Sequence, residues 1–206
     1  MRKYIKFILS FLFICWNSFL LGISYEEIQY SQFQSLILMI GKDKIYTHLE
    51  KKSQSLGIVT VVGVIRAPID VVWRTINSDD KKLYPEFLYK EVKKISENIL
   101  VKKALLDFPW PFENRWTIYR EKLDPKIYAK EWYEIGGDIK VNRGAVRLFS
   151  LNPEETVMVF KSQFDPGIGI VPIWAIEMGM KYKAPSIIQK IRDYLKNNPH
   201  KGEGKN

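Results

Sequence analysis

The chain has 206 residues, enough for one domain with a sizeable core but too few for two full domains. Hydrophobic residues make up 46% and charged residues 27% of it, a balance that excludes a wholly disordered chain. The formal charge is +9, but no dense basic patch interleaved with aromatic residues occurs, so the sequence does not indicate nucleic-acid binding. The single cysteine, Cys15, lies in the opening segment, which excludes a thiolate metal site or a cysteine nucleophile elsewhere.

The opening segment has the pattern of a secretory signal. A basic start is followed by an apolar run, and Gly22 and Ser24 occupy positions −3 and −1 before Tyr25. We therefore predict that residues 1–24 are a signal peptide cleaved near Ser24, which implies a periplasmic or secreted protein. The alternative is an uncleaved N-terminal membrane anchor, because residues 7–23 approach the ~17-residue minimum for spanning. A polar Asn-Ser pair inside this stretch counts against the anchor.

The next segments predict a helix, a hairpin and a second helix. Residues 25–40 carry apolar side chains at helical spacing and end at Gly41, which predicts an amphipathic helix. Residues 44–51 alternate and residues 57–65 are rich in β-branched side chains, so the two predict a β-hairpin. Pro68 suits the first turn of a short helix that follows directly.

Strand-like runs fill the middle of the chain, and a helix closes it. Turn signals separate six further predicted strands, over residues 90–98, 99–108, 115–123, 126–135, 145–152 and 155–164. The last element has a continuous apolar stripe at helical spacing and contains Pro185, which is expected to kink it. Residues 25–197 thus form one predicted domain, and residues 198–206 a disordered tail.

This order of elements predicts an α+β architecture. A meandering antiparallel sheet, short helices after an early strand and one long C-terminal helix are typical of the helix-grip fold. In that fold the curved sheet wraps around the C-terminal helix, and the space between them can stay open as a cavity.

Three segments resemble a known family. VIRAPIDVVWRTI, PWPFENRWTIY and the segment from Phe164 to Leu195 are similar to START-type lipid-binding domains of the Bet v 1-like (helix-grip, SRPBCC) superfamily. The resemblance covers residues 25–197. Arg115 matches an arginine of the family pattern, whereas Trp116 replaces the acid that commonly follows it. The resemblance implies a hydrophobic cavity for a lipid, a sterol or a polyketide-like ligand.

The sequence offers little catalytic machinery. His48 is the one histidine on a predicted element, where it is expected at the surface. The sequence also has a cluster of three carboxylate side chains, Glu131, Glu134 and Asp138. Such a cluster is more typical of a solvated strand edge than of a catalytic site. The common hydrolase, phosphate-loop and zinc motifs are absent. We therefore predict no catalytic residues, no metal and no cofactor.

Aromatic side chains, Trp132 among them, lie along the predicted strands, and most are expected to fill a packed core. A sheet of this size can still leave a pocket, for which Met158, Met178 and Met180 would be an adaptable lining. Arg147 would meet a ligand carboxylate or phosphate if its face is the cavity, and solvent if it is not. The candidate ligand-binding residues are Trp110, Phe112, Arg115, Trp116, Tyr119, Tyr133, Arg147, Phe149, Phe164, Trp174 and Met178.

These observations favour an exported protein that binds or transfers a lipid or another hydrophobic small molecule, with transient contact to a membrane surface. One alternative is an enzyme similar to the polyketide cyclases and aromatases of the same superfamily. The other is a non-enzymatic interaction module of the cell envelope with a closed core.

Overall fold

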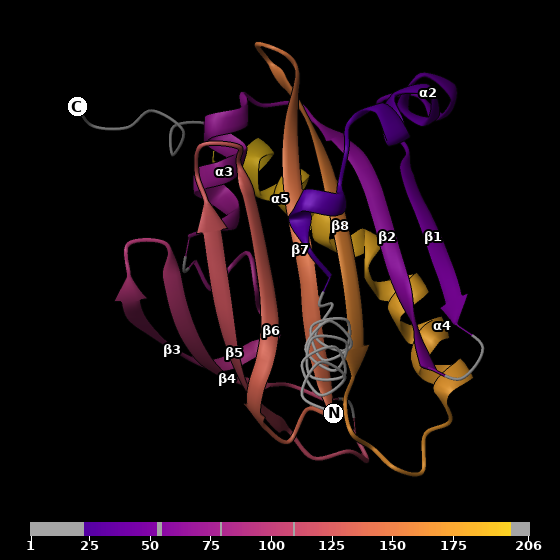
Figure 1. Cartoon of the computed structure of the whole chain (residues 1–206), viewed down its shortest axis with the longest axis vertical. Helices are drawn as coiled ribbons and strands as arrows, with labels where there is room; N and C mark the ends of the chain where they lie inside the picture. The colour runs from indigo at the N-terminus through magenta and orange to yellow at the C-terminus, as the bar shows by residue number, and fades with distance from the viewer. Residues whose placement is uncertain (1–22, 53–54, 79, 109, 199–206) are drawn as a thin grey trace, which may run out of the picture.

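The computed structural model describes residues 23–52, 55–78, 80–108 and 110–198. Its centre is one antiparallel sheet with the strand order β1-β2-β8-β7-β6-β5-β4-β3 (Figure 1). The strands are β1 (Ile45–Lys52), β2 (Ser55–Ile65), β3 (Phe87–Ser96), β4 (Ile99–Leu106), β5 (Arg115–Asp124), β6 (Ala129–Gly137), β7 (Val141–Asn152) and β8 (Glu155–Asp165). The predicted hairpin and the six further predicted strands are all present.

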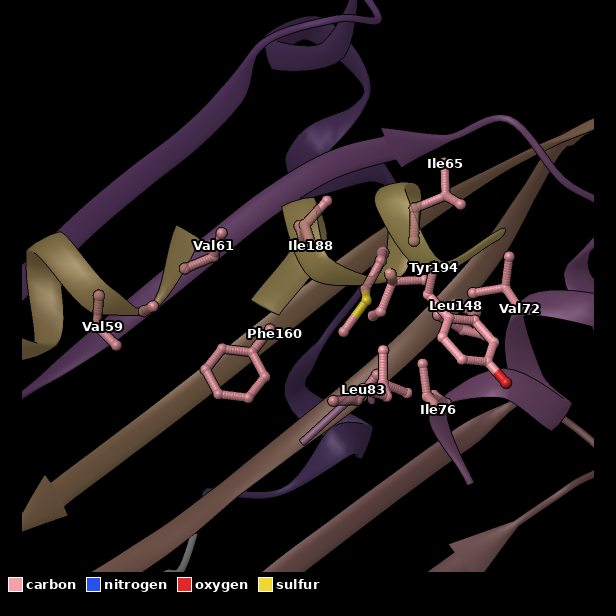
Figure 2. Close-up of a cluster of buried hydrophobic side chains, with 14 of the residues drawn as sticks. Val59, Val61, Ile65, Val72, Ile76, Leu83, Leu148, Phe160, Ile188 and Tyr194 are labelled. Carbon is pink, nitrogen blue, oxygen red and sulfur yellow. The ribbon is translucent and has the colours of Figure 1, made fainter. Parts of the chain in front are cut away.

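One face of the sheet, called the helix face below, packs against three helices. These are α3 (Ile69–Ile76), α4 (Ile173–Lys183) and α5 (Pro185–Asn197). Alternate residues of the strands point to this face, and their apolar side chains form a core with the helices (Figure 2). Ile188 and Ile191 of α5 are almost fully buried in it. The sheet therefore curves around the C-terminal helices, which confirms the predicted α+β helix-grip architecture.

The C-terminal helix is divided, as Pro185 predicts. The first part ends at Lys183 and the second begins at Pro185. A guanidinium clamp fixes the second part on the sheet: Arg192 Nε and Nη2 both donate to the carbonyl of Val64, at 2.9 and 2.7 Å. Because the pairing of β1 with β2 begins only at Gly63, this carbonyl lies beyond the last β1 pair and Arg192 supplies its donors.

The opposite face of the sheet, called the N-terminal face below, is partly covered by the start of the described chain. A 3₁₀ turn, η1 (Tyr25–Glu27), and the helix α2 (Ser31–Ile40) follow each other there. Ile23, Tyr25 and Ile28 pack with strand residues that alternate with those of the helix face. The predicted helix over residues 25–40 is therefore shorter, beginning only at Ser31.

The predicted signal peptide and tail fall largely outside the described residues. Ile23 and Ser24 are the part of the predicted signal that the structure describes, and Asn198 is the part of the predicted tail. Among the described helices, none is long and apolar enough to cross a membrane.

Candidate functional site

A cavity of about 230 Å³ lies between the helix face of the sheet and α5. The main contributors to its apolar wall come from three strands and the helix: they are Leu106 of β4, Val146 of β7, Met158, Phe160 and Phe164 of β8, and Ile191 of α5. Each strand contributes alternate residues, since only every second side chain of a strand reaches one face. The cavity is thus a space that the packed core leaves unfilled beside the grip helix.

Three buried charged side chains form one cluster in the cavity wall, called the charge triad below. Glu121 of β5 is 3% exposed, and Lys102 of β4 and Lys130 of β6 are nearly as buried. Glu121 Oε1 accepts from Lys130 Nζ at 2.9 Å, and Glu121 Oε2 is ion-paired with Lys102. Lys130 Nζ also donates to the Ile76 carbonyl at 3.0 Å and to Asn77 Oδ1 at 3.2 Å. One carboxylate is therefore shared by two ammonium groups.

The charge triad shifts the pKa of its acid. Burial alone would raise the pKa of Glu121, because removal from water disfavours the charged form. The neighbouring charges of Lys130 and Lys102 outweigh burial and lower this pKa from 4.5 to about 2. Glu121 is therefore ionised throughout the neutral range.

A second set of polar side chains orients Trp132, whose indole ring belongs to the cavity wall. Trp132 Nε1 donates to Asn142 Oδ1 at 3.1 Å, and Asn142 Nδ2 donates to Thr117 Oγ1 at 2.9 Å. The ring lies over Gly144, where a Cβ atom would come within 2.4 Å of Trp132 Cζ2. The absence of a side chain at position 144 thus leaves the space that the Trp132 ring occupies.

The part of the cavity wall that lies between α5 and the start of β3 consists of half-buried residues. Tyr84, Phe87 and Lys90 belong to this part of the wall, with Ile187 of α5 opposite. Lys190 Nζ lies 2.8 Å from Glu86 Oε2, so an ion pair joins α5 to the turn before β3.

No family model matches the chain, and no curated protein matches it. Solved structures do. Human STARD10 superposes with a TM-score of 0.63 at 13% identity, covering 87% of this chain and 84% of its own. A STAR-related lipid transfer protein from Xanthomonas axonopodis gives 0.62 at 16% identity, with 74% and 93% covered. The Zhui aromatase/cyclase from Streptomyces gives 0.58 at 17% identity, with 70% and 96% covered.

The fold is the helix-grip fold of the START and Bet v 1-like proteins. The identities to these solved structures are low, so the likeness concerns the fold, and the function has to be argued from this chain's own cavity.

Within this helix-grip domain, two of the eleven candidate ligand-binding residues line the cavity. They are Tyr119 of β5 and Phe164 of β8. Trp132 and Met158, which belong to the wider aromatic and methionine sets, line it as well.

Four candidates lie on the N-terminal face because of strand alternation. Trp116 stacks edge-on with Tyr89, with ring centroids 5.6 Å apart, and Tyr133 is exposed. Arg147 Nη1 donates to the Ile28 carbonyl at 2.8 Å, and Phe149 packs beside Tyr30. Arg147 is thus half-buried beneath the N-terminal segment and lies outside the cavity.

The other five candidates lie at one end of the sheet or on the outer surface of α4. Phe112 and Arg115 are half-buried around the β4–β5 connection, outside the cavity wall. Trp110, Trp174 and Met178 are exposed. Residues of the charge triad, in contrast, are absent from the candidate set. The sequence contains a signal for one of them. Glu121 stands two residues after the candidate Tyr119, so strand alternation places both side chains on the same face of the sheet.

Proposed function

We propose that this protein binds a lipid or another hydrophobic small molecule in the cavity between the sheet and α5, without transforming it. The observation that carries the proposal is the cavity itself, with its mainly apolar wall and a few convergent polar groups. It favours ligand binding over an interaction module with a closed core. The lipid transfer protein among the similar structures supports the same function.

The size of the cavity bears on the kind of ligand. Sites for drug-sized ligands usually measure ~300–1,000 Å³, so about 230 Å³ suits a smaller or single-chain molecule. Its binding would be stabilised by roughly 25 cal/mol per Å² of apolar surface removed from water. A larger lipid would need the wall between α5 and β3 to open.

An enzyme acting on a polyketide-like substrate is the second candidate. Two observations favour it: the charge triad brings titratable groups together in the cavity, and one similar structure is an aromatase/cyclase. The chemistry of the triad counts against it. A general base works best with a pKa near the operating pH, whereas the pKa of Glu121 is about 2. The contacts of Lys130 with Ile76, Asn77 and Glu121 already occupy the three donors of its ammonium group.

Filling the cavity is expected to abolish ligand binding. Ser162 of β8 lies in the wall, and the ring of Ser162→Phe would occupy the space. The full chain is titrated with the neutral fluorophore phenylnaphthylamine, and bound probe is measured by fluorescence. We expect saturable binding to the wild type and to the control Ser162→Ala, and none to Ser162→Phe. Circular dichroism checks the fold, since overpacking costs about 1–3 kcal/mol. Undiminished binding to a folded Ser162→Phe variant would refute the proposal.

We also propose that the protein is exported by its opening segment. Cleavage after Ser24 would leave an α-ammonium group at Tyr25, whose nitrogen lies 3.4 Å from Glu131 Oε2. The new terminus would thus gain an ion pair on the surface of β6. Intact-mass measurement of the exported chain is expected to show Tyr25 as the first residue. A mass that includes Met1 would contradict cleavage.

Exposed apolar side chains at one end of the sheet suit a membrane surface, and we call this set the apolar lip. Its members are Trp110, Ile170, Ile173 and Trp174. The strand register places the β4–β5 connection, the β6–β7 turn and the end of β8 at the same end, because Thr117 pairs with Gly137 and Val141 with Asp165. We propose that the apolar lip contacts a membrane while the ligand is exchanged.

A further inference from the structure

Cationic side chains outnumber anionic ones in the cavity wall. The charge triad carries two ammonium groups and one carboxylate, a formal excess of one positive charge. The other charged residues of the wall are Lys90 and Glu86, and Glu86 is ion-paired with Lys190 of α5. No other charged side chain among the described residues lines this cavity. The wall therefore has a net positive charge.

A buried net charge is costly unless an opposite charge compensates it. Glu121 stays ionised at neutral pH, but its one charge is divided between Lys102 and Lys130. A ligand that brings an anionic group into the cavity would balance the wall, and the attraction would be little screened at a buried site. A neutral ligand would bring no such charge to the wall.

The polar and apolar parts of the wall suit an amphiphile, a molecule with one polar and one apolar end. Lys102 and Tyr119 are paired across β4 and β5 and both reach the cavity. Phe160, Phe164 and Met158 of β8 form an apolar part of the wall. The space between these parts is about 230 Å³, which is below the ~300–1,000 Å³ of sites for drug-sized ligands.

We propose that the cavity selects a single-chain amphiphile with an anionic head group, such as a carboxylate, and that Lys102 binds the head group. This inference rests on the proposed function, since it assumes that the cavity binds a hydrophobic ligand. Lys102 and Tyr119 lie beside each other in the wall, so the head group would meet an ammonium group and a phenol together. The alkyl chain would lie against the β8 side chains and Ile191.

The test compares two ligands that differ only in the head group. Decanoate and decyl alcohol are each used to displace bound phenylnaphthylamine from the full-length wild type and from three variants. These variants are Lys102→Met, Lys102→Arg and Lys103→Met. We expect decanoate to bind the wild type about tenfold more tightly or better, as a charge-assisted hydrogen bond implies. Lys102→Met should lose this preference, whereas Lys102→Arg, which retains the charge, should keep it.

The matched control is Lys103→Met, which removes the same charge from the same strand. Lys103 points to the N-terminal face, where its Nζ lies 4.6 Å from the centroid of the Trp116 ring. The preference for decanoate should survive this change.

The outcomes separate the two proposals. A wild type that binds neither the fluorophore nor either amphiphile would overturn the proposed function. A wild type that binds decanoate and decyl alcohol equally would leave the proposed function standing and overturn the anionic selectivity. This second comparison needs no variant, so it decides the question even if Lys102→Met fails to fold. A preference that Lys102→Met retains would overturn the role of Lys102.

Discussion

Glu121→Gln is expected to lower the free energy of unfolding by about 3–5 kcal/mol, the usual cost of breaking a buried ion pair by removing one partner. The substitution preserves the shape of the side chain but removes the charge that Lys102 and Lys130 share. Both lysine side chains would remain almost fully buried without this charge. An effect of this size is a large fraction of the ~5–15 kcal/mol that stabilises a typical domain.

Urea unfolding of the full chain, followed by circular dichroism, measures this loss. The matched control is Glu97→Gln, which makes the same chemical change in the exposed turn between β3 and β4. A surface substitution of this kind is expected to change stability by less than about 0.5 kcal/mol. Should Glu121→Gln also stay within that range, the charge triad does not stabilise the fold.

The pH dependence of stability gives a second measurement of the same group. The pKa of Glu121 is about 2 in the folded chain and 4.5 ordinarily, so the ionised form stabilises the fold above pH 4.5. This contribution is lost as the pH falls from 4.5 towards 2, and it amounts to about 3 kcal/mol. Glu121→Gln should therefore flatten the acid limb of the stability profile relative to the wild type.

The strands could be predicted because their alternation and turn residues are local signals. The start of the domain could not. Residues 25–40 have helical periodicity, but Tyr25 and Ile28 form only a 3₁₀ turn and make long-range contacts: the Tyr25 amide lies near Glu131, and the Ile28 carbonyl accepts from Arg147. Such tertiary bonds compete with the helix and are invisible in a local pattern.

The cavity wall was harder to predict because aromatic content does not say which face a side chain occupies. Tyr119 and Trp116 both lie on β5, three residues apart, and so point to opposite faces. The assignment of faces depends on which strand residues the helices cover, and this is a property of the assembled fold. Lys102 and Lys130 resembled ordinary surface lysines for the same reason, since their shared acid lies on a strand between them.

Replacing the two tryptophans of the apolar lip is expected to weaken membrane binding about 100-fold, which corresponds to roughly 3 kcal/mol. Trp110 is 92% and Trp174 67% exposed, so both rings are available to a membrane surface in the free protein. Tryptophan suits the membrane interface because its ring is apolar and its N–H can stay hydrated. Full burial of a large apolar side chain contributes about 1.5–3 kcal/mol, so two rings account for the effect.

The position of the lip links membrane contact to the cavity. Phe108, in the same connection as Trp110, stacks on Phe164 with ring centroids 6.5 Å apart, and Phe164 lines the cavity. Lys140, in the neighbouring β6–β7 turn, is largely exposed and is ion-paired with Asp165 at 3.7 Å. A membrane at this end would therefore meet apolar side chains beside the cavity wall.

Cosedimentation of the full chain with vesicles of phosphatidylcholine and phosphatidylglycerol measures this binding. The double variant Trp110→Ser/Trp174→Ser is compared with Ile95→Ser/Tyr182→Ser, which removes two exposed apolar side chains away from the lip. Ile95 lies near the β3–β4 turn at the opposite end of the sheet, and Tyr182 lies about 13 Å along α4 from Ile173. Only the first double variant should lose binding. Equal losses in both would mean that general surface hydrophobicity, rather than the lip, brings the protein to the membrane.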